Sequence, residues 1–225
     1  MRILIVAADR REFAGWNLPV AGRSRSFPTG RLNGHEVLLV ANGAGRARAA
    51  AAVDEALSVF PADAVVSAGF CGALDPALRV ADIVVGTTVS GPEGSYAELP
   101  VRAAVASHSG PVCSLDHVAR TAEEKRMLRA AGACAVEMEA AGVAARAHSR
   151  GLPFYCVHTV TDLASETLQN DFNRALRTDG HFDTMIILRD LLQNPRARLA
   201  ELVRLRKRCV RASRALGNFL GHCRF

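Results

Sequence analysis

Aromatic residues are scarce in this chain of 225 residues, where they make up 5% and include a single Trp, Trp16. Platforms that stack single-stranded nucleic acid normally need more aromatic side chains than this. No apolar run approaches the ~18–20 residues that a transmembrane helix requires. The apolar run at residues 3–8 is short and leads directly into the charged residues 9–12, so no signal peptide is predicted. The composition predicts a globular protein.

Metal and cofactor motifs are also missing. The seven His show neither H-E-x-x-H nor H-x-x-x-H spacing, so no metal site is predicted. Gly43 and Gly45 lack the third Gly and the spaced acid of a dinucleotide fingerprint, so no NAD site is expected. The six Cys contain no C-x-x-C pair, and most lie among Val and Ala, where a thiol behaves as a small apolar group. We expect reduced cysteines in a cytoplasmic protein that needs no cofactor.

Positive charge is concentrated at one end of the chain. The formal net charge is +6, and residues 201–225 carry seven Lys or Arg against one acid, Glu201. This segment therefore accounts for the whole net charge, and the remaining 200 residues are about neutral. Nucleic-acid binding through the basic segment is one alternative function, but the neutral body and the few aromatic residues disfavour it.

The pattern of apolar runs predicts a three-layer α/β/α fold with a central mixed, mostly parallel sheet. No linker or internal repeat interrupts the chain. We therefore expect one catalytic domain over residues 1–194, followed by a basic amphipathic helix at 195–225 that is part of the same domain or a surface-binding tail. Strands are predicted at residues 1–8, 35–41, 64–68, 82–89, 111–114, 133–136 and 154–160, and helices at 46–60, 121–131, 139–150 and from 182 onward, with a break at Pro195.

Acidic residues follow three of the predicted strands. Glu12 follows the first strand, Glu137 and Glu139 follow the strand at 133–136, and Asp162 follows the strand at 154–160. Ligands of open α/β sheets bind at the carboxyl ends of the strands, so these side chains are expected to share one crevice. Each acid taken alone is better explained as a helix cap or first-turn residue, and it is the joint pattern that favours a shared site.

Two motifs resemble the nucleoside phosphorylase and nucleosidase superfamily: the run V-E-M-E at residues 136–139 and the pair Thr161-Asp162. The glycine-rich segment 67–76 and the run V-A-D-I-V-V at 80–85 are similar to the same family. Residues 9–12 resemble the 5′-methylthioadenosine/S-adenosylhomocysteine nucleosidases. Residues 116–125 and the Arg-rich C-terminal segment are closer to hopanoid-associated phosphorylases, which are linked to the removal of adenine from adenosylhopane in hopanoid biosynthesis.

This resemblance implies a partly barrel-like sheet and a homo-oligomer, commonly a dimer in which a neighbouring subunit completes the 5′ pocket. It also implies roles for the acids. Asp162 would protonate N7 of the leaving adenine, and ionised Glu139 would accept hydrogen bonds from the ribose hydroxyls and stabilise the developing ribosyl cation. Met138 would lie against the ribose, or be an ordinary core residue. The other substrate-binding candidates are Glu137, which is also a candidate structural partner, Val118, Ala68, Gly69 and Phe70.

The identity of the nucleophile separates two reactions. A water nucleophile needs a carboxylate base, and Glu12 lies where the nucleosidases have theirs. A phosphate nucleophile needs cations and N–H groups, which Gly45, Arg46 and Arg48 offer at the start of a predicted helix. The same residues are also explained as a turn and a solvated helix face. Hydrolysis is favoured, and a phosphate-dependent purine nucleoside phosphorylase is the alternative.

Three residues depart from the family pattern. Phe70 stands where the family usually has a small residue, His158 stands where an Arg is common, and Thr161 replaces a Ser. Neither Asp162 nor Glu139 is lost. The departures predict an altered pocket and a substrate other than the usual small 5′-thio nucleosides.

The C-terminal helix is predicted to be amphipathic. A stripe of this kind suits an anionic membrane surface, or it packs on the sheet or on a second subunit. A non-catalytic protein of this fold that binds a membrane surface or a nucleoside is a further alternative, which the retained acids disfavour. The apolar stripe consists of Leu202, Leu205, Cys209, Ala212, Leu216, Phe219 and Leu220.

Overall fold

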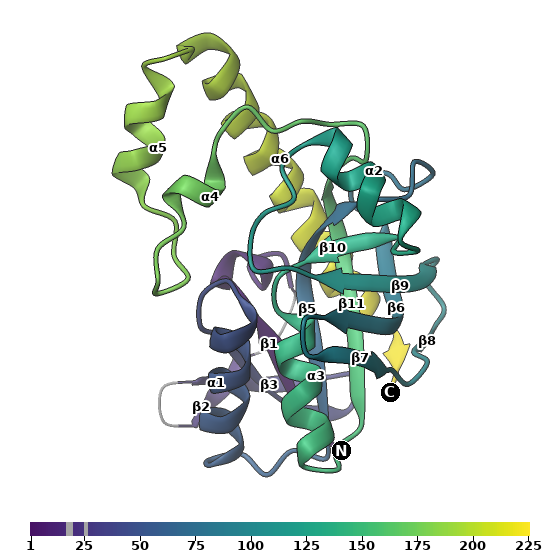
Figure 1. Ribbon diagram of the computed structural model, residues 1–225. Coiled ribbons are helices and arrows are strands. Elements are labelled where there is room, and N and C mark those ends of the chain that lie inside the picture. Colours follow the sequence, from purple (N-terminus) through teal and green to yellow (C-terminus); the bar gives the residue numbers. More distant parts are fainter. Residues whose placement is uncertain (17–19, 25–26) are drawn as a thin grey trace.

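The computed structural model describes residues 1–16, 20–24 and 27–225 (Figure 1). Its centre is a mixed sheet with the strand order β10-β9-β6-β11-β5-β1-β4-β3-β2, and β7 pairs with β6 at one side. The strands are β1 (Arg2–Ala7), β2 (Val20–Ser24), β3 (Phe27–Leu32), β4 (His35–Ala41), β5 (Ala64–Ala73), β6 (Ile83–Gly91), β7 (Gly94–Ala97), β9 (His108–Ser114), β10 (Ala135–Glu137) and β11 (Phe154–Asp162). A separate pairing joins β8 (Arg102–Ala103) to β12 (Cys223–Arg224).

One part of the sheet closes on itself. β10 pairs in parallel with β9 and also pairs antiparallel with β5, so that β5, β11, β6, β9 and β10 form a ring. The ring is continued by β1 and β4, which are parallel to β5, and by the antiparallel hairpin of β2 and β3. The partly barrel-like mixed sheet that the resemblance implied is confirmed.

Helices cover both faces of this sheet (Figure 1). Helices α1 and α3 pack together on one face through their alanines, and Gly142 lies so close to α1 that an added Cβ would meet the Arg46 carbonyl oxygen at 2.1 Å. The second half of α6 covers the other face with Leu216, Phe219 and Leu220. The three-layer architecture is confirmed. The helices are η1 (Arg10–Glu12), α1 (Arg46–Leu57), α2 (Ala122–Ala130), α3 (Ala140–Ser149), α4 (Phe172–Ala175), α5 (Thr184–Leu191) and α6 (Pro195–Leu220).

The predicted helix boundaries have local causes. Thr121 caps α2, because its Oγ1 accepts a hydrogen bond from the N–H of Glu124 at 3.1 Å. The Glu124 carboxylate returns to the N–H of Arg120 at 3.0 Å, one residue earlier than in a standard capping box. Pro195 starts α6 at a position where its missing N–H costs nothing, and so it separates α5 from α6.

The strand predicted at residues 64–68 is longer in the structure, because β5 continues through the glycine-rich segment to Ala73. Its pairing with β11 continues over these residues, with His158 opposite Gly69 and Asp162 opposite Gly72. The backbone hydrogen bonds of β11 keep the glycines extended.

Helices α4 and α5 and the first half of α6 form a helical arm, residues 172–205, that projects beyond the end of the sheet (Figure 1). The base of the arm contacts the loop after β4, because the N–H of Ala44 donates to the carbonyl oxygen of Gly180 at 2.8 Å. Within the described residues, no helix combines the length and apolar character needed to cross a bilayer.

Candidate active site

Glu12 is a buried carboxylate at the end of η1. Its Oε2 accepts a hydrogen bond from the N–H of Asp9 at 2.9 Å, and its Oε1 accepts one from the N–H of Phe70 at 2.8 Å. Burial raises the pKa of Glu12 to about 7, and these two hydrogen bonds only partly oppose the shift. A carboxyl group with this pKa can accept a proton from water near neutral pH. The capping explanation also holds, since Glu12 closes a capping box with Asp9.

Asp162 ends β11 and is paired with a residue that the sequence analysis missed. The Lys125 ammonium donates a hydrogen bond to Asp162 Oδ2, and it also donates to the carbonyl oxygen of Leu163 at 2.9 Å. Thr161 Oγ1 lies 3.1 Å from Asp162 Oδ1. The Lys125 side chain has no exposed surface, whereas the Asp162 side chain is 14% exposed. One feature of the sequence could have indicated this residue. Lys125 and Leu128 are three positions apart and so lie on the same face of α2, which puts a lysine on the inward face of that helix.

Glu137 and Glu139 have different partners. Glu137 Oε2 accepts the N–H groups of Glu139 and Ala140, both at 2.7 Å, and its Oε1 accepts a hydrogen bond from Ser114 Oγ. Glu137 therefore holds the start of α3. Glu139 Oε1 accepts the N–H of Gly45 at 2.8 Å, and its Oε2 accepts the N–H of Met138 at 3.2 Å. Glu139 thus links the start of α3 to the start of α1.

Burial raises the pKa of Glu139 well above its usual value, and the carboxylates of Glu137 and Glu12 add to the shift. The resemblance to the nucleosidases implied an ionised Glu139. Burial and the two neighbouring acids favour its neutral form instead. Hydroxyl donors and a developing positive charge would favour ionisation, so the charge of Glu139 would become available as the reaction proceeds.

The glycines of β5 bring the two outer acids to the same strand. A Cβ added at Gly69 would lie 2.7 Å from Glu12 Oε1, and one added at Gly72 would lie 3.0 Å from Asp162 Oδ2. Any side chain at these positions would displace a carboxylate. The carboxylates of Glu12 and Asp162 therefore lie against β5 at two glycines that are three residues apart. Strand β10, which ends just before Glu139, pairs with the same strand.

The donors proposed to hold phosphate are largely engaged within the protein. The N–H of Gly45 donates to Glu139, and the Arg46 guanidinium donates to both carboxylate oxygens of Asp116, at 2.8 and 2.6 Å. Arg48 donates to the carbonyl oxygen of Thr178 at the base of the arm, at 3.1 Å. A phosphate ion would have to displace these partners, and it would also meet the carboxylate of Glu139.

The remaining candidate residues lie in different surroundings. Ala68 and Met138 are buried, with Ala68 in the core beneath α6. Val118 lies in the loop before α2, and its N–H and C=O are both bonded to the side-chain amide of Asn173, at 2.6 and 3.0 Å. The adenine ring of a substrate that bound to the N–H and C=O of Val118 would have to displace Asn173.

His158 is buried, and burial lowers its pKa to about 3, so it is neutral. Its Nε2 lies 3.5 Å from Glu137 Oε2, and its Nδ1 lies 3.2 Å from Cys156 Sγ. The residue that replaces a common Arg thus supports Glu137 instead of adding a charge. Over the residues with described positions, no group of three or more His, Cys, Asp or Glu could hold a metal ion.

The sequence matches the phosphorylase superfamily over residues 5–98 and 97–187. The chain belongs to the phosphorylase superfamily. Within this superfamily it is an enzyme of the nucleosidase or nucleoside phosphorylase type, and the resemblance in the sequence is confirmed.

Known members of the phosphorylase superfamily resemble the chain along most of its length. The chain is 29% identical over 192 residues to the 5′-methylthioadenosine/S-adenosylhomocysteine nucleosidase of Geobacillus thermodenitrificans (strain NG80-2). This match covers 72% of this chain and 81% of that protein. The S-adenosylhomocysteine nucleosidase of Streptococcus pyogenes has a similar fold, with a TM-score of 0.72 at 19% identity over 98% of this chain and 94% of that one. Futalosine hydrolase of Helicobacter pylori has a TM-score of 0.70 at 16% identity, over 98% and 95% of the two chains.

Proposed function

We propose that this enzyme hydrolyses the N-ribosyl bond of an adenine nucleoside that carries a modified 5′ position. The observation that carries the proposal is that two carboxyl groups lie against the same strand, β5: that of Glu12, whose pKa burial raises to about 7, beside Gly69, and that of Asp162 beside Gly72. Its sequence relatives named 5′-methylthioadenosine/S-adenosylhomocysteine nucleosidases support the same chemistry.

Each acid has one task in the proposed reaction. Asp162 gives a proton to N7 of adenine while the bond from C1′ to the base breaks, and the electron pair of that bond passes to the base. The ribose becomes a cation, which Glu139 stabilises while it accepts the ribose hydroxyls. Water then bonds to C1′ and gives a proton to Glu12. Glu137 and Ser114 hold the start of α3, and so they position Glu139.

Water is the favoured nucleophile because the pocket that phosphate would need is acidic and its donors have partners. Ionised Glu12 would repel a phosphate ion, and Glu139 already accepts the N–H of Gly45 that phosphate would need. Gly45, Arg46 and Arg48 already bind Glu139, Asp116 and Thr178. Phosphorolysis is the alternative, and it requires these contacts to break.

We expect a 5′ substituent larger than methylthio, such as the lipid of adenosylhopane. The resemblance of residues 116–125 to hopanoid-associated phosphorylases favours a lipid-linked nucleoside, and Phe70, next to Glu12, alters the pocket relative to the family pattern. We also expect a homodimer whose second subunit completes the 5′ pocket, which light scattering would reveal as a doubled mass.

The proposed reaction predicts adenine release that is independent of phosphate and depends on Glu12. We expect Glu12→Gln to lose ~10²–10⁴-fold in kcat/KM, since it cannot accept a proton. Because a base works only when ionised, wild-type kcat/KM should fall as the pH drops through about 7. The assay follows adenine release from 5′-methylthioadenosine, S-adenosylhomocysteine and a 5′-alkyl adenosine, with and without phosphate.

The matched control for this assay is Glu55→Gln, which changes an exposed acid on α1. It should behave like the wild type. Turnover that requires phosphate and yields ribose 1-phosphate would refute hydrolysis, and it would return Arg46 and Arg48 to the role of phosphate ligands.

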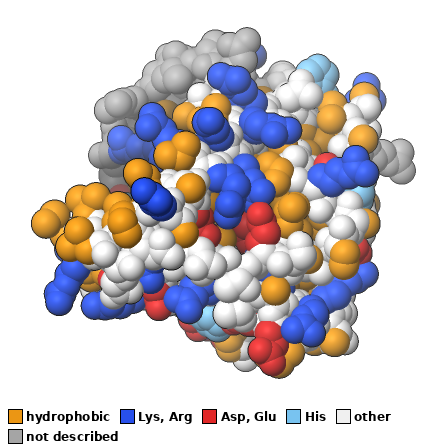
Figure 2. Space-filling view, turned by 90° about the horizontal axis from the view of Figure 1, so that it is seen from above, with side chains coloured by type: hydrophobic (Ala, Val, Ile, Leu, Met, Phe, Trp, Pro, Cys, Tyr) orange, Lys and Arg blue, Asp and Glu red, His pale blue; other side chains and the backbone are white. Residues whose placement is uncertain are grey.

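A specific surface supports the proposed contact with a membrane. The second half of the predicted apolar stripe packs on the sheet, but the arm exposes other apolar residues, with Met185 72% and Leu192 81% exposed. Leu188, Leu199 and Val203 are also about half exposed. Figure 2 shows hydrophobic side chains gathered on this projecting part, with Lys and Arg side chains beside them.

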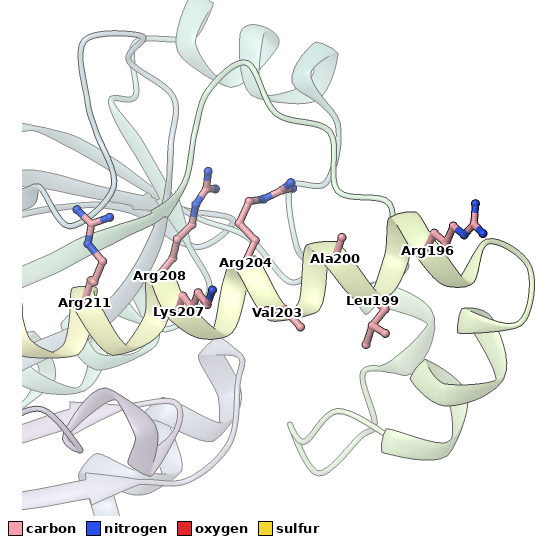
Figure 3. A pocket seen from close by; sticks show the side chains of 8 residues that line it. All are labelled: Arg196, Leu199, Ala200, Val203, Arg204, Lys207, Arg208 and Arg211. Atoms are coloured by element: carbon pink, nitrogen blue, oxygen red, sulfur yellow. The ribbon is translucent and has the colours of Figure 1, made fainter.

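Cations line an open groove of about 710 Å³ along α6, next to these apolar residues (Figure 3). Arg196, Lys207 and Arg211 face it without a carboxylate partner among the described residues. Apolar residues that project beside unpaired cations suit an anionic bilayer. The apolar side chains would insert among the acyl chains, and the cations would bind the anionic headgroups. A second copy of the chain docked on the same surface would bring its own cations against the cations of this groove. Charge repulsion therefore favours an anionic lipid surface over a second copy as the partner.

We therefore predict that the protein binds vesicles that contain phosphatidylglycerol, and that salt weakens this binding. The double variant Met185→Glu/Leu192→Glu should lose co-sedimentation with the vesicles, because two charges replace the apolar tip. Met127→Glu is the control, since Met127 is 63% exposed on α2 and lies outside the arm. Failure to bind at low salt, or binding that survives the double variant, would exclude the arm as a membrane contact.

A further inference from the structure

Lys125 is a fully buried cation that the reaction proposed above does not use. It lies on the first turns of α2, and its ammonium contacts two acceptors, the Asp162 carboxylate and the carbonyl oxygen of Leu163. Burying a lysine is costly unless its charge is paired, and replacing a buried ion pair by apolar residues is often neutral or stabilising. Stability alone therefore does not explain this pair.

An ion pair also conflicts with the task of Asp162. A nearby cation favours the ionised carboxylate, but a general acid must hold a proton when the leaving group departs. The Lys125 ammonium carries a proton directed at Asp162 Oδ2. The conflict disappears if this proton moves between the two groups.

We infer that Lys125 is the proton reservoir of Asp162: the pair holds one proton, which rests on the amine in the free enzyme and passes to the carboxylate when substrate covers the site. The inference rests on the proposed role of Asp162 as general acid. Substrate binding would remove the last 14% of exposed surface from the Asp162 side chain. Loss of that hydration disfavours two separated charges relative to a neutral amine beside a neutral acid.

The step balances in atoms and electrons. The Nζ–H bond of Lys125 breaks, an O–H bond forms on Asp162, and the amine is left neutral. This O–H bond then breaks as the N7–H bond of adenine forms, and the electron pair of the glycosidic bond passes to the base. Water supplies the hydroxyl group on C1′ and leaves its proton on Glu12. Exchange with solvent returns a proton to Lys125 and removes one from Glu12.

The other ionisable groups around Asp162 cannot supply this proton. Arg208, on α6, is held by both oxygens of Glu166, and a guanidinium does not give up its proton in proteins. Cys71 on β5 and Cys209 on α6 are neutral thiols, because burial raises the pKa of Cys71 well above its usual value and that of Cys209 to about 11.

The test is the pH profile of adenine release by Lys125→Met, compared with Arg126→Met, an exposed cation on the same helix. Without the reservoir, Asp162 must hold its own proton at a pH where Glu12 is ionised. We expect kcat/KM of Lys125→Met to fall relative to the wild type, and the loss to grow by up to about tenfold per pH unit as the pH rises, because the ionised carboxylate has no proton to give. Arg126→Met should follow the wild-type profile.

Lys125→Arg gives a second, independent readout. An arginine keeps the positive charge and the hydrogen bond but cannot release its proton, so a structural role would be rescued and a reservoir would not. If Lys125→Met does not fold, Lys125→Gln replaces it, because it keeps a donor toward Asp162 without a charge.

The inference is overturned if the Lys125→Met profile runs parallel to the wild type, if its alkaline limb moves to higher pH, or if Lys125→Arg is fully active. Failure of the proposed function has a different signature, which is adenine release that survives removal of the Asp162 carboxyl group.

Discussion

Asp162→Asn is expected to abolish adenine release while substrate binding persists, with a fall in kcat of at least ~10²-fold. The amide keeps the size of the side chain and an acceptor for Thr161 or Lys125, but it has no proton that adenine can take. Single-turnover measurements with 5′-methylthioadenosine or a 5′-alkyl adenosine, together with equilibrium binding, separate the chemical step from affinity. A variant with near wild-type turnover would remove Asp162 from the role of general acid.

This substitution also changes the partner of a buried lysine, so stability must be measured separately. Breaking a buried ion pair from one side costs about 3–5 kcal/mol when the remaining charge is left without compensation. Here the Asn oxygen and the Leu163 carbonyl still face Lys125, so we expect a smaller loss in the free energy of unfolding. The double variant Asp162→Asn/Lys125→Met should regain stability in urea titrations but remain inactive. Recovery of both stability and turnover would mean that the activity loss came from misfolding.

Glu139→Gln is the second large effect that we expect, with a loss of ~10²–10³-fold in kcat. A neutral amide removes the negative charge that would oppose the ribosyl cation. It also places an N–H donor where the N–H of Gly45 or Met138 now finds an acceptor. Steady-state kinetics with the folded variant measure the effect, and KM should rise as well because the ribose hydroxyls lose an acceptor.

Glu137→Gln is the matched comparison, because it changes the neighbouring buried acid in the same way. Glu137 accepts two N–H groups and a hydroxyl at the start of α3, so its substitution should lower the melting temperature more than Glu139→Gln does. If Glu139→Gln lost only stability and kept its kinetics, Glu139 would be a structural residue.

The strand and helix pattern could be predicted because each element carries its own local signal. The Thr121 cap, the stop at Gly151 and the buried-type strands all lie within short windows of sequence. The role of the glycines in β5 could not be predicted from local sequence. Gly69 and Gly72 leave the space that Glu12 and Asp162 occupy, and both acids reach β5 from distant parts of the chain.

The acids were predictable as residues at strand ends, but their partners were not. Lys125 meets Asp162 across 37 positions, and Asn173 meets Val118 across 55. Neither pair could be predicted from local spacing, because each depends on where α2 and α4 pack relative to the end of the sheet. The raised pKa of Glu139 likewise follows from tertiary burial beside Glu137 and Glu12.

Helix α6 sets a length scale for the substrate. The exposed Leu199 lies near the start of this helix, and Ser213, whose hydroxyl donates to the carbonyl oxygen of Glu12 at 2.9 Å, lies in its second half. The two residues are 14 positions apart in the helix, so at about 1.5 Å of rise per residue they are separated by roughly 21 Å along its axis. If the arm rests in lipid, this continuous helix would hold Glu12 within roughly that distance of the bilayer. A nucleoside that stays anchored in the membrane while its ribose reaches Glu139 would then need a 5′ chain of comparable length.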